Sequence, residues 1–119
     1  SLPTVALLGG DVNRNNLVTT GKSSLDFLNT INIEIAVMTA TGFTPEKGLF
    51  TCGSQDEMEI KHAVIEGASK VILLLDSSKV DKNTPYTFCK LDKVDYLVVD
   101  KNFPEELREK IEAQGVKVI

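Results

Sequence analysis

Runs of mostly apolar residues, four of them followed by small or polar residues, constrain this chain more than any other feature. Five such runs occur, at residues 5–8, 33–38, 71–75, 96–99 and 116–119. Because they do not alternate with polar residues, they are typical of strands buried on both faces, as in a parallel sheet. The longest strongly apolar run, at 71–75, is far too short to span a bilayer.

Helical patterns lie between these runs. Ser23 or Ser24 can cap a helix whose residues Leu25, Leu28 and Ile31 point inward. The alternation of strands and helices predicts one α/β domain with a mostly parallel sheet flanked by helices. The length of 119 residues fits a single domain of this kind.

The clearest helix start lies at Ser54, which forms an S-x-x-E capping box with Glu57. An apolar stripe follows at helical spacing, and Met58 and Ile65 lie on roughly the opposite side of the helix. We therefore expect both sides of this helix to be covered, one of them by a partner subunit. The stripe consists of Ile60, Ala63, Val64 and Gly67.

A last helix is predicted near the end of the chain. Pro104 suits its first turn, and Gly115 is placed to end it. Phe103, Leu107 and Ile111 recur at a spacing of four, which gives this helix one apolar side.

The ends of the predicted strands carry the residues most suited to binding. Gly9 and Gly10 follow the first run, Thr39 to Gly42 the second, Asp76 to Lys79 the third and Asp100 the fourth. In an open parallel sheet these ends share one edge, where ligands bind. Lys79 brings a positive charge there, and glycine amides can approach an anion closely. Each of these residues also ends strands simply because it forms turns.

Glu57 has two interpretations. As the acidic residue of a capping box it satisfies amides at the helix start, and Lys61, four residues on, can pair with it. Glu57 also lies at the border of the inward stripe that contains Ile60 and Val64, which makes it a candidate for binding.

The composition excludes several functions. A net charge of −4 and a pI near 4.9 argue against gripping nucleic acid, because phosphate binding requires a basic stripe. His62 is the single histidine, and Cys52 and Cys89 lie far apart in the sequence. A histidine-based zinc site and a Ser–His–Asp triad are therefore not expected, and the cysteines are expected to be reduced thiols of a cytosolic protein.

The ordered set of motifs resembles the C-terminal sensor domain of DeoR-type bacterial transcription regulators. The set runs in order over nearly the whole chain: Gly9-Gly10 with Gly21, Thr41-Gly42 with Gly48-Leu49, Glu57 with Lys61, Asp76-Ser77-Ser78-Lys79, and a strand ending in Asp100.

The resemblance implies a fold similar to ribose-5-phosphate isomerase and a pocket for a phosphorylated sugar effector, without cofactor or metal. Lys79 would contact the ligand or its phosphate, and Asp76 would orient the loop. Glu57 would hydrogen-bond sugar hydroxyls. Gly9-Gly10 and Thr41-Gly42 would line the pocket. The chain would thus be the effector-binding part of a cytoplasmic regulator, a repressor of sugar-use genes, rather than an enzyme.

The family pattern normally begins earlier than this sequence does. A helix-turn-helix that binds the operator, and a D-x-G-T-T-like loop that cradles phosphate, would both precede Ser1. Residues 1–119 are therefore expected to be the C-terminal part of the sensor, truncated at its N-terminus. Apolar surface left uncovered by the missing elements would favour a homo-oligomer.

Two alternatives come from other classes. A sugar-phosphate isomerase would need acid–base groups that the stretch from Thr39 to Phe43 lacks, although Glu57 and Lys79 remain. A phosphorylation-receiver domain would need an acidic pair after the first strand, where only Asp11 occurs. Turnover of ribose 5-phosphate and acetyl-phosphate labelling of Asp76 would reveal the first and second alternative, respectively.

Overall fold

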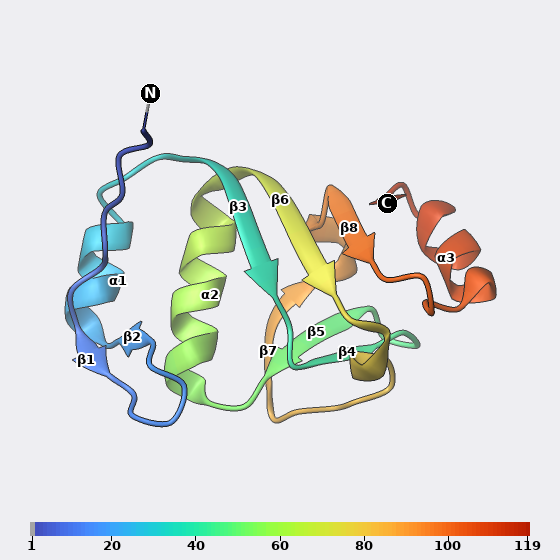
Figure 1. Cartoon of the computed structure of the whole chain (residues 1–119), viewed down its shortest axis with the longest axis horizontal. Coiled ribbons are helices and arrows are strands. Elements are labelled where there is room, and N and C mark those ends of the chain that lie inside the picture. Colours follow the sequence, from blue (N-terminus) through green and yellow to red (C-terminus); the bar gives the residue numbers. More distant parts are fainter. Residues whose placement is uncertain (1) are drawn as a thin grey trace.

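A four-stranded parallel sheet forms the frame of the molecule in the computed structural model, which describes residues 2–119. Its order is β3-β6-β8-β9, with β3 at Ile33–Thr39, β6 at Ala68–Leu75, β8 at Tyr96–Val99 and β9 at Lys117–Val118. Four of the five predicted strands are thus confirmed, and so is the α/β class. In Figure 1, β3 and β6 run side by side in the same direction.

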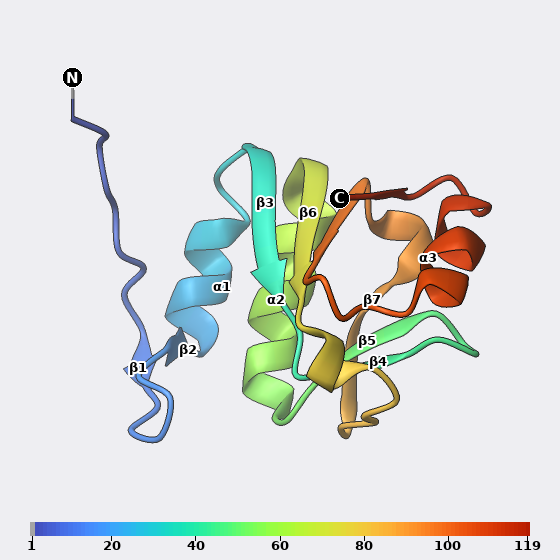
Figure 2. The ribbon, with the colours of Figure 1, turned by 45° about the vertical axis from the view of Figure 1, so that its right-hand side comes forward.

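The predicted strand at residues 5–8 is wrong. These residues form no strand, and the side chains of Val5 and Leu7 are 85% and 89% exposed. Figure 2 shows this segment leading away from the sheets. A strand exists only where its amides and carbonyls pair with a neighbouring strand, and residues 2–119 supply no neighbour here. The first strand is instead β1, Asp11–Val12, which pairs with β2, Thr19–Thr20, as a short antiparallel hairpin.

A second sheet, which the apolar runs did not predict, is antiparallel and has the order β4-β5-β7. It consists of β4 at Gly42–Thr44, β5 at Leu49–Cys52 and β7 at Tyr86–Lys90. Its phenylalanines fill the core: the rings of Phe43 and Phe50 stack with centroids 4.5 Å apart, and Phe88 is also buried.

Helix α2, Gln55–Gly67, lies between this core and helix α1, Lys22–Leu28. The predicted start of α2 is confirmed, because the Ser54 hydroxyl accepts a hydrogen bond from the Glu57 amide. Its inward stripe was misassigned: Ile65, expected on the opposite side, is the residue buried in the core. The helix is covered on a second side by α1 of the same chain.

The remaining helices follow their predicted patterns in part. Helix α1 begins after Gly21 without a side-chain cap, and Ile31 lies beyond its end and is exposed, contrary to expectation. Helix α3, Glu105–Glu112, follows Pro104 as predicted, with Phe103 and Ile111 buried. Within residues 2–119, no helix combines the length and apolar character that crossing a membrane requires.

The two faces of the parallel sheet differ in what covers them. The face that carries Ala36, Val71 and Leu73 is buried under α2 and the antiparallel sheet. On the other face, Ile35 and Val37 are 51% and 58% exposed, although both belong to an apolar run. We call this second surface the open face; it consists of Ile35, Val37, Ile72, Leu74, Tyr96 and Val98.

Candidate functional site

The carboxyl ends of three parallel strands meet at one edge of the sheet, as predicted. The register pairs Thr39 of β3 with Leu74 of β6, and Leu75 of β6 with Val99 of β8, so the three strands end nearly level. A cavity of about 470 Å³ lies at these ends. Its lining includes Thr39, Ala40, Asp76, Lys79 and Asp100. We refer to it as the strand-end cavity.

Asp100 fastens the loop that carries Lys79. One carboxylate oxygen of Asp100 accepts from the Ser77 amide at 3.1 Å, and the other accepts from the Ser77 hydroxyl at 2.9 Å. These two bonds connect the end of β8 to the short 3₁₀ helix Ser77–Lys79, which follows β6 directly. The loop is therefore held against the sheet edge, with Lys79 lining the cavity.

Asp76 caps the same 3₁₀ helix by accepting from the Ser78 amide at 3.1 Å. Hydrogen bonds from the backbone and side chain of Ser78 lower the pKa of the Asp76 carboxyl, and the charges of Lys79 and Lys82 add to this effect. Asp76 is therefore ionised at neutral pH and orders the turn that presents Lys79.

A second cavity of about 320 Å³ shares Thr39 with the first. Two charged side chains of α2, Glu57 and Lys61, line it together with Thr41. The rest of its lining comes from the N-terminal hairpin region, the end of β3 and one apolar residue of α2; we call it the helix-side cavity. Its further lining residues are Asn16, Val18, Thr19, Thr20, Thr39 and Ile60.

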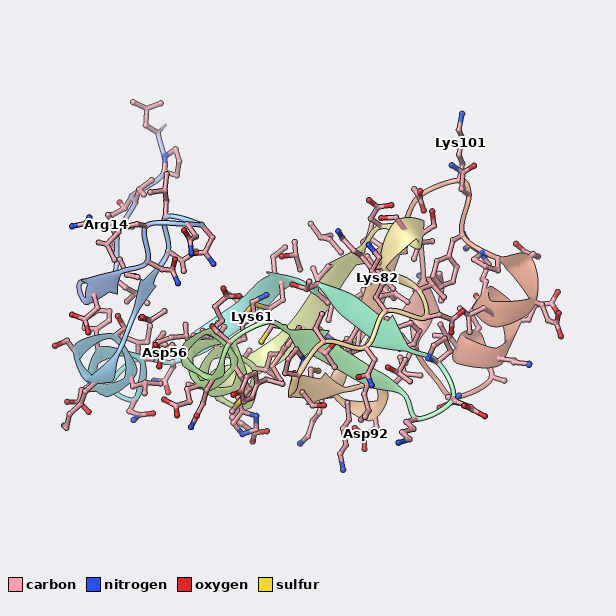
Figure 3. The ribbon with its side chains drawn as sticks, turned by 90° about the horizontal axis from the view of Figure 1, so that it is seen from below. Arg14, Asp56, Lys61, Lys82, Asp92 and Lys101 are labelled. Atoms are coloured by element: carbon pink, nitrogen blue, oxygen red, sulfur yellow. The ribbon has the colours of Figure 1, made fainter. Side chains whose placement is uncertain are left out.

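Glu57 and Lys61 have separate partners in the helix-side cavity. The Glu57 carboxylate accepts a hydrogen bond from the Asn16 side-chain amide, so it does not close the capping box from its own side. The Lys61 ammonium donates to the Thr39 carbonyl at 2.8 Å and lies 4.8 Å from the centre of the Phe88 ring. Figure 3 labels Lys61 beside α2, next to β3.

The glycines predicted to line the pocket occupy other environments. A Cβ atom on Gly42 would lie 2.3 Å from the Lys82 carbonyl oxygen, so this glycine permits close backbone packing. Gly10 has φ +150° and lies against the Thr20 carbonyl, while the Gly9 carbonyl accepts from the Ser24 hydroxyl. Among the described residues, neither cavity is lined by Gly9, Gly10 or Gly42.

The structure thus brings four of the predicted residues to two adjoining cavities, namely Thr41, Glu57, Asp76 and Lys79. It adds Asn16, Lys61 and Asp100. The position of Asp100 at a strand end and the spacing of Lys61 from Glu57 were visible in the sequence. No sequence signal pointed to Asn16, because it reaches Glu57 from a loop 41 residues away.

The site has the character of a binding site for a polar organic anion. It offers two ammonium groups, carboxylates and several hydroxyls around two adjoining cavities, each of the size of a small metabolite. Residues 2–119 contain no group of three or more His, Cys, Asp or Glu side chains arranged to hold a metal ion. Burial raises the pKa of Cys52, and the charge of Glu57 adds to this effect, so the thiol stays protonated at neutral pH.

Comparison with known proteins places this site in a family. The sequence profile described as the DeoR C terminal sensor domain matches residues 2–101. The HTH-type transcriptional regulator GlpR of Haloferax volcanii is 30% identical over 115 residues, which cover 97% of this chain and 45% of that protein. An uncharacterized HTH-type transcriptional regulator of Haemophilus influenzae is 31% identical over 110 residues, covering 92% and 42%.

A further relative is the HTH-type transcriptional repressor GlcR of Bacillus subtilis, which is 25% identical over 115 residues, covering 97% of this chain and 44% of that protein. The chain therefore spans less than half the length of these curated relatives. The profile match covers most of the chain. The chain belongs to the family of DeoR C-terminal sensor domains.

Proposed function

We propose that this chain is the effector-sensing part of a cytoplasmic DeoR-type transcription regulator, a repressor of sugar-use genes, and that its effector is a phosphorylated sugar or a related metabolite. The single observation that carries the proposal is Lys79, held by the Asp76 turn and the Asp100 bonds at the mouth of the strand-end cavity. Family membership and the regulators among its relatives support it.

The roles of the site residues follow from their chemistry. Lys79 binds the phosphate as a point charge, and Asp76 and Asp100 keep its loop in place. Glu57 accepts hydrogen bonds from sugar hydroxyls in the helix-side cavity, and Thr41 contributes a hydroxyl there. Thr39 borders both cavities, which supports placing the phosphate end of the ligand in one and the hydroxyl-bearing end in the other.

The proposal assigns DNA binding to another part of the polypeptide. The acidic balance of this chain is unsuited to operator contact, and the relatives carry as much sequence again beyond the matched part. Residues 1–119 are then the C-terminal part of the sensor, and the preceding part of the sensor packs on the open face and beside the unpaired edge of β3. The regulator works as a homo-oligomer.

Regulation requires that the effector bind one arrangement of the subunits more tightly than another. Ligand at the sheet edge contacts the ends of β3 and β6, the loop after β6 and the start of α2. Ordering these elements together changes how the sensor subunits meet, and thereby how the DNA-binding parts reach the operator.

The test is an operator-release titration of the intact regulator with a panel of sugar phosphates. Lys79→Ala should raise the concentration needed for half-release about tenfold or more, because a charged contact contributes roughly 1.5–3 kcal/mol. Operator affinity without effector should stay unchanged. An unaltered dose-response in this variant would remove Lys79 from the site.

The isomerase alternative is tested on the same protein. An isomerase needs a base that moves a proton between adjacent carbons. The relatives are named as transcriptional regulators, which favours binding without turnover. Conversion of ribose 5-phosphate that is abolished by Glu57→Gln would overturn the regulator proposal in favour of catalysis.

A further inference from the structure

Glu57 and Lys61 lie one turn apart on α2, yet they do not form the ion pair that this spacing usually gives. The ion pairs among residues 2–119 join Lys22 with Asp26, Arg108 with Glu105 and Lys110 with Glu106. The Glu57 carboxylate instead bonds Asn16, and the Lys61 ammonium bonds the Thr39 carbonyl. A carboxylate and an ammonium therefore border the same cavity without neutralising each other directly.

Lys61 is held in position but retains unused donors. Its ammonium is fixed by the Thr39 carbonyl at 2.8 Å and by the Phe88 ring face at 4.8 Å, and the side chain is half-buried. An ammonium has three donors, of which the carbonyl takes one. A partly desolvated charge with spare donors is a favourable partner for ligand oxygens.

The surroundings of Lys61 indicate which oxygens it suits. Besides Glu57 and Lys61, whose charges sum to zero, the helix-side cavity is lined by four threonines, one asparagine and the apolar residues Val18 and Ile60. A second phosphate there would be repelled by the Glu57 carboxylate. A hydroxyl both donates and accepts, so adjacent sugar hydroxyls satisfy Glu57 as acceptor and Lys61 as donor at once.

We propose that Lys61 is a specificity-determining residue of the effector site, donating to an oxygen of the hydroxyl-bearing end of a sugar monophosphate while Glu57 accepts from a neighbouring hydroxyl. This assignment rests on the proposed function, in which Lys79 holds the phosphate at the other end. It narrows the ligand class to sugar monophosphates and disfavours bisphosphates.

The experiment measures binding to the intact regulator by calorimetry, with hexose 6-phosphates and inorganic phosphate as the probes. Lys61→Met keeps a flexible side chain of similar length but removes the charge and the donors. It should weaken hexose 6-phosphate binding about ten- to hundredfold and leave the affinity for inorganic phosphate unchanged. Lys110→Met, which makes the same charge change on the exposed side of α3, is the matched control and should alter neither affinity.

The outcomes separate this assignment from the proposed function. If Lys61→Met weakened the binding of both probes equally, Lys61 would be a phosphate ligand. If it weakened the binding of neither, Lys61 would have a structural role. Either result would overturn the assignment. Lys61→Gln, with a polar end that tolerates partial burial, gives the same comparison if the Met variant unfolds. Failure of the unchanged protein to bind any hexose 6-phosphate would instead overturn the proposed function, and the assignment with it.

Discussion

Leu73 and Leu74 are neighbours on β6 and point to opposite faces of the parallel sheet, and their surroundings could hardly differ more. Leu73 is 0% exposed under α2 and the antiparallel sheet, whereas Leu74 on the open face is 39% exposed. The same apolar run thus supplies one face that is a complete core and one that is not. Parallel sheets normally have both faces covered, so we expect the open face to pack against another protein segment or subunit.

The largest expected effect is a difference in stability between truncations on the two faces of the sheet. Leu73→Ala should lower the free energy of unfolding by about 2–5 kcal/mol, because it leaves a cavity in a closed core. Leu74→Ala should cost less than about 1 kcal/mol, since its side chain already contacts solvent. Urea unfolding of the two variants measures both. Equal losses would mean that the open face is packed in solution.

A charged residue on the open face tests whether this face takes part in self-association. Val37→Lys should leave the free energy of unfolding within about 0.5 kcal/mol, because Val37 is largely exposed. It should also reduce self-association of the chain, which the apolar open face and the unpaired edge of β3 favour. Sedimentation velocity over a range of concentrations measures this. An unchanged chain that stays monomeric throughout would contradict the expectation.

The smallest expected effect is on the pH dependence of stability and comes from Cys89, a buried thiol of the core. Burial raises the pKa of Cys89 from its ordinary value of 9.0 to about 12, and Asp92 and Glu66 add to the shift. Between these two values the unfolded chain loses the proton while the folded chain keeps it, so stability is fully present below pH 9.0 and falls as the pH rises toward 12. Cys89→Ala should make the urea midpoint fall less steeply above pH 9.0 than in the unchanged chain. Identical slopes would show that the Cys89 thiol is accessible in the native state.

The strands of the parallel sheet could be predicted because their apolar runs are continuous and end at polar residues. Residues 71–75 became the core of β6, and Asp76 follows it at the expected edge. The same pattern misled at residues 5–8, where the apolar run has no strand beside it. An apolar run indicates that burial of the segment would be favourable. Whether it becomes a buried strand depends on which other elements pack beside it.

The antiparallel sheet and half of the site were beyond this kind of prediction. Phe43, Phe50 and Phe88 lie in short segments in which threonine interrupts or ends the apolar residues, so no continuous apolar run predicts their strands. The cap at Ser54 was readable because its bond is local, but the bond from Asn16 to Glu57 depends on how a distant loop folds back. The glycine pair at Gly9 and Gly10 was predicted to share the sheet edge because a strand was expected before it.

The most direct test of the central claim is an amide NMR titration of this chain with hexose 6-phosphates. We expect the largest chemical-shift changes at the amides of Thr39, of the loop from Asp76 to Lys79 and of the first two turns of α2. Shifts confined to the separate cavity that His62 and Cys89 line would contradict it, because that cavity shares no residue with the strand-end site.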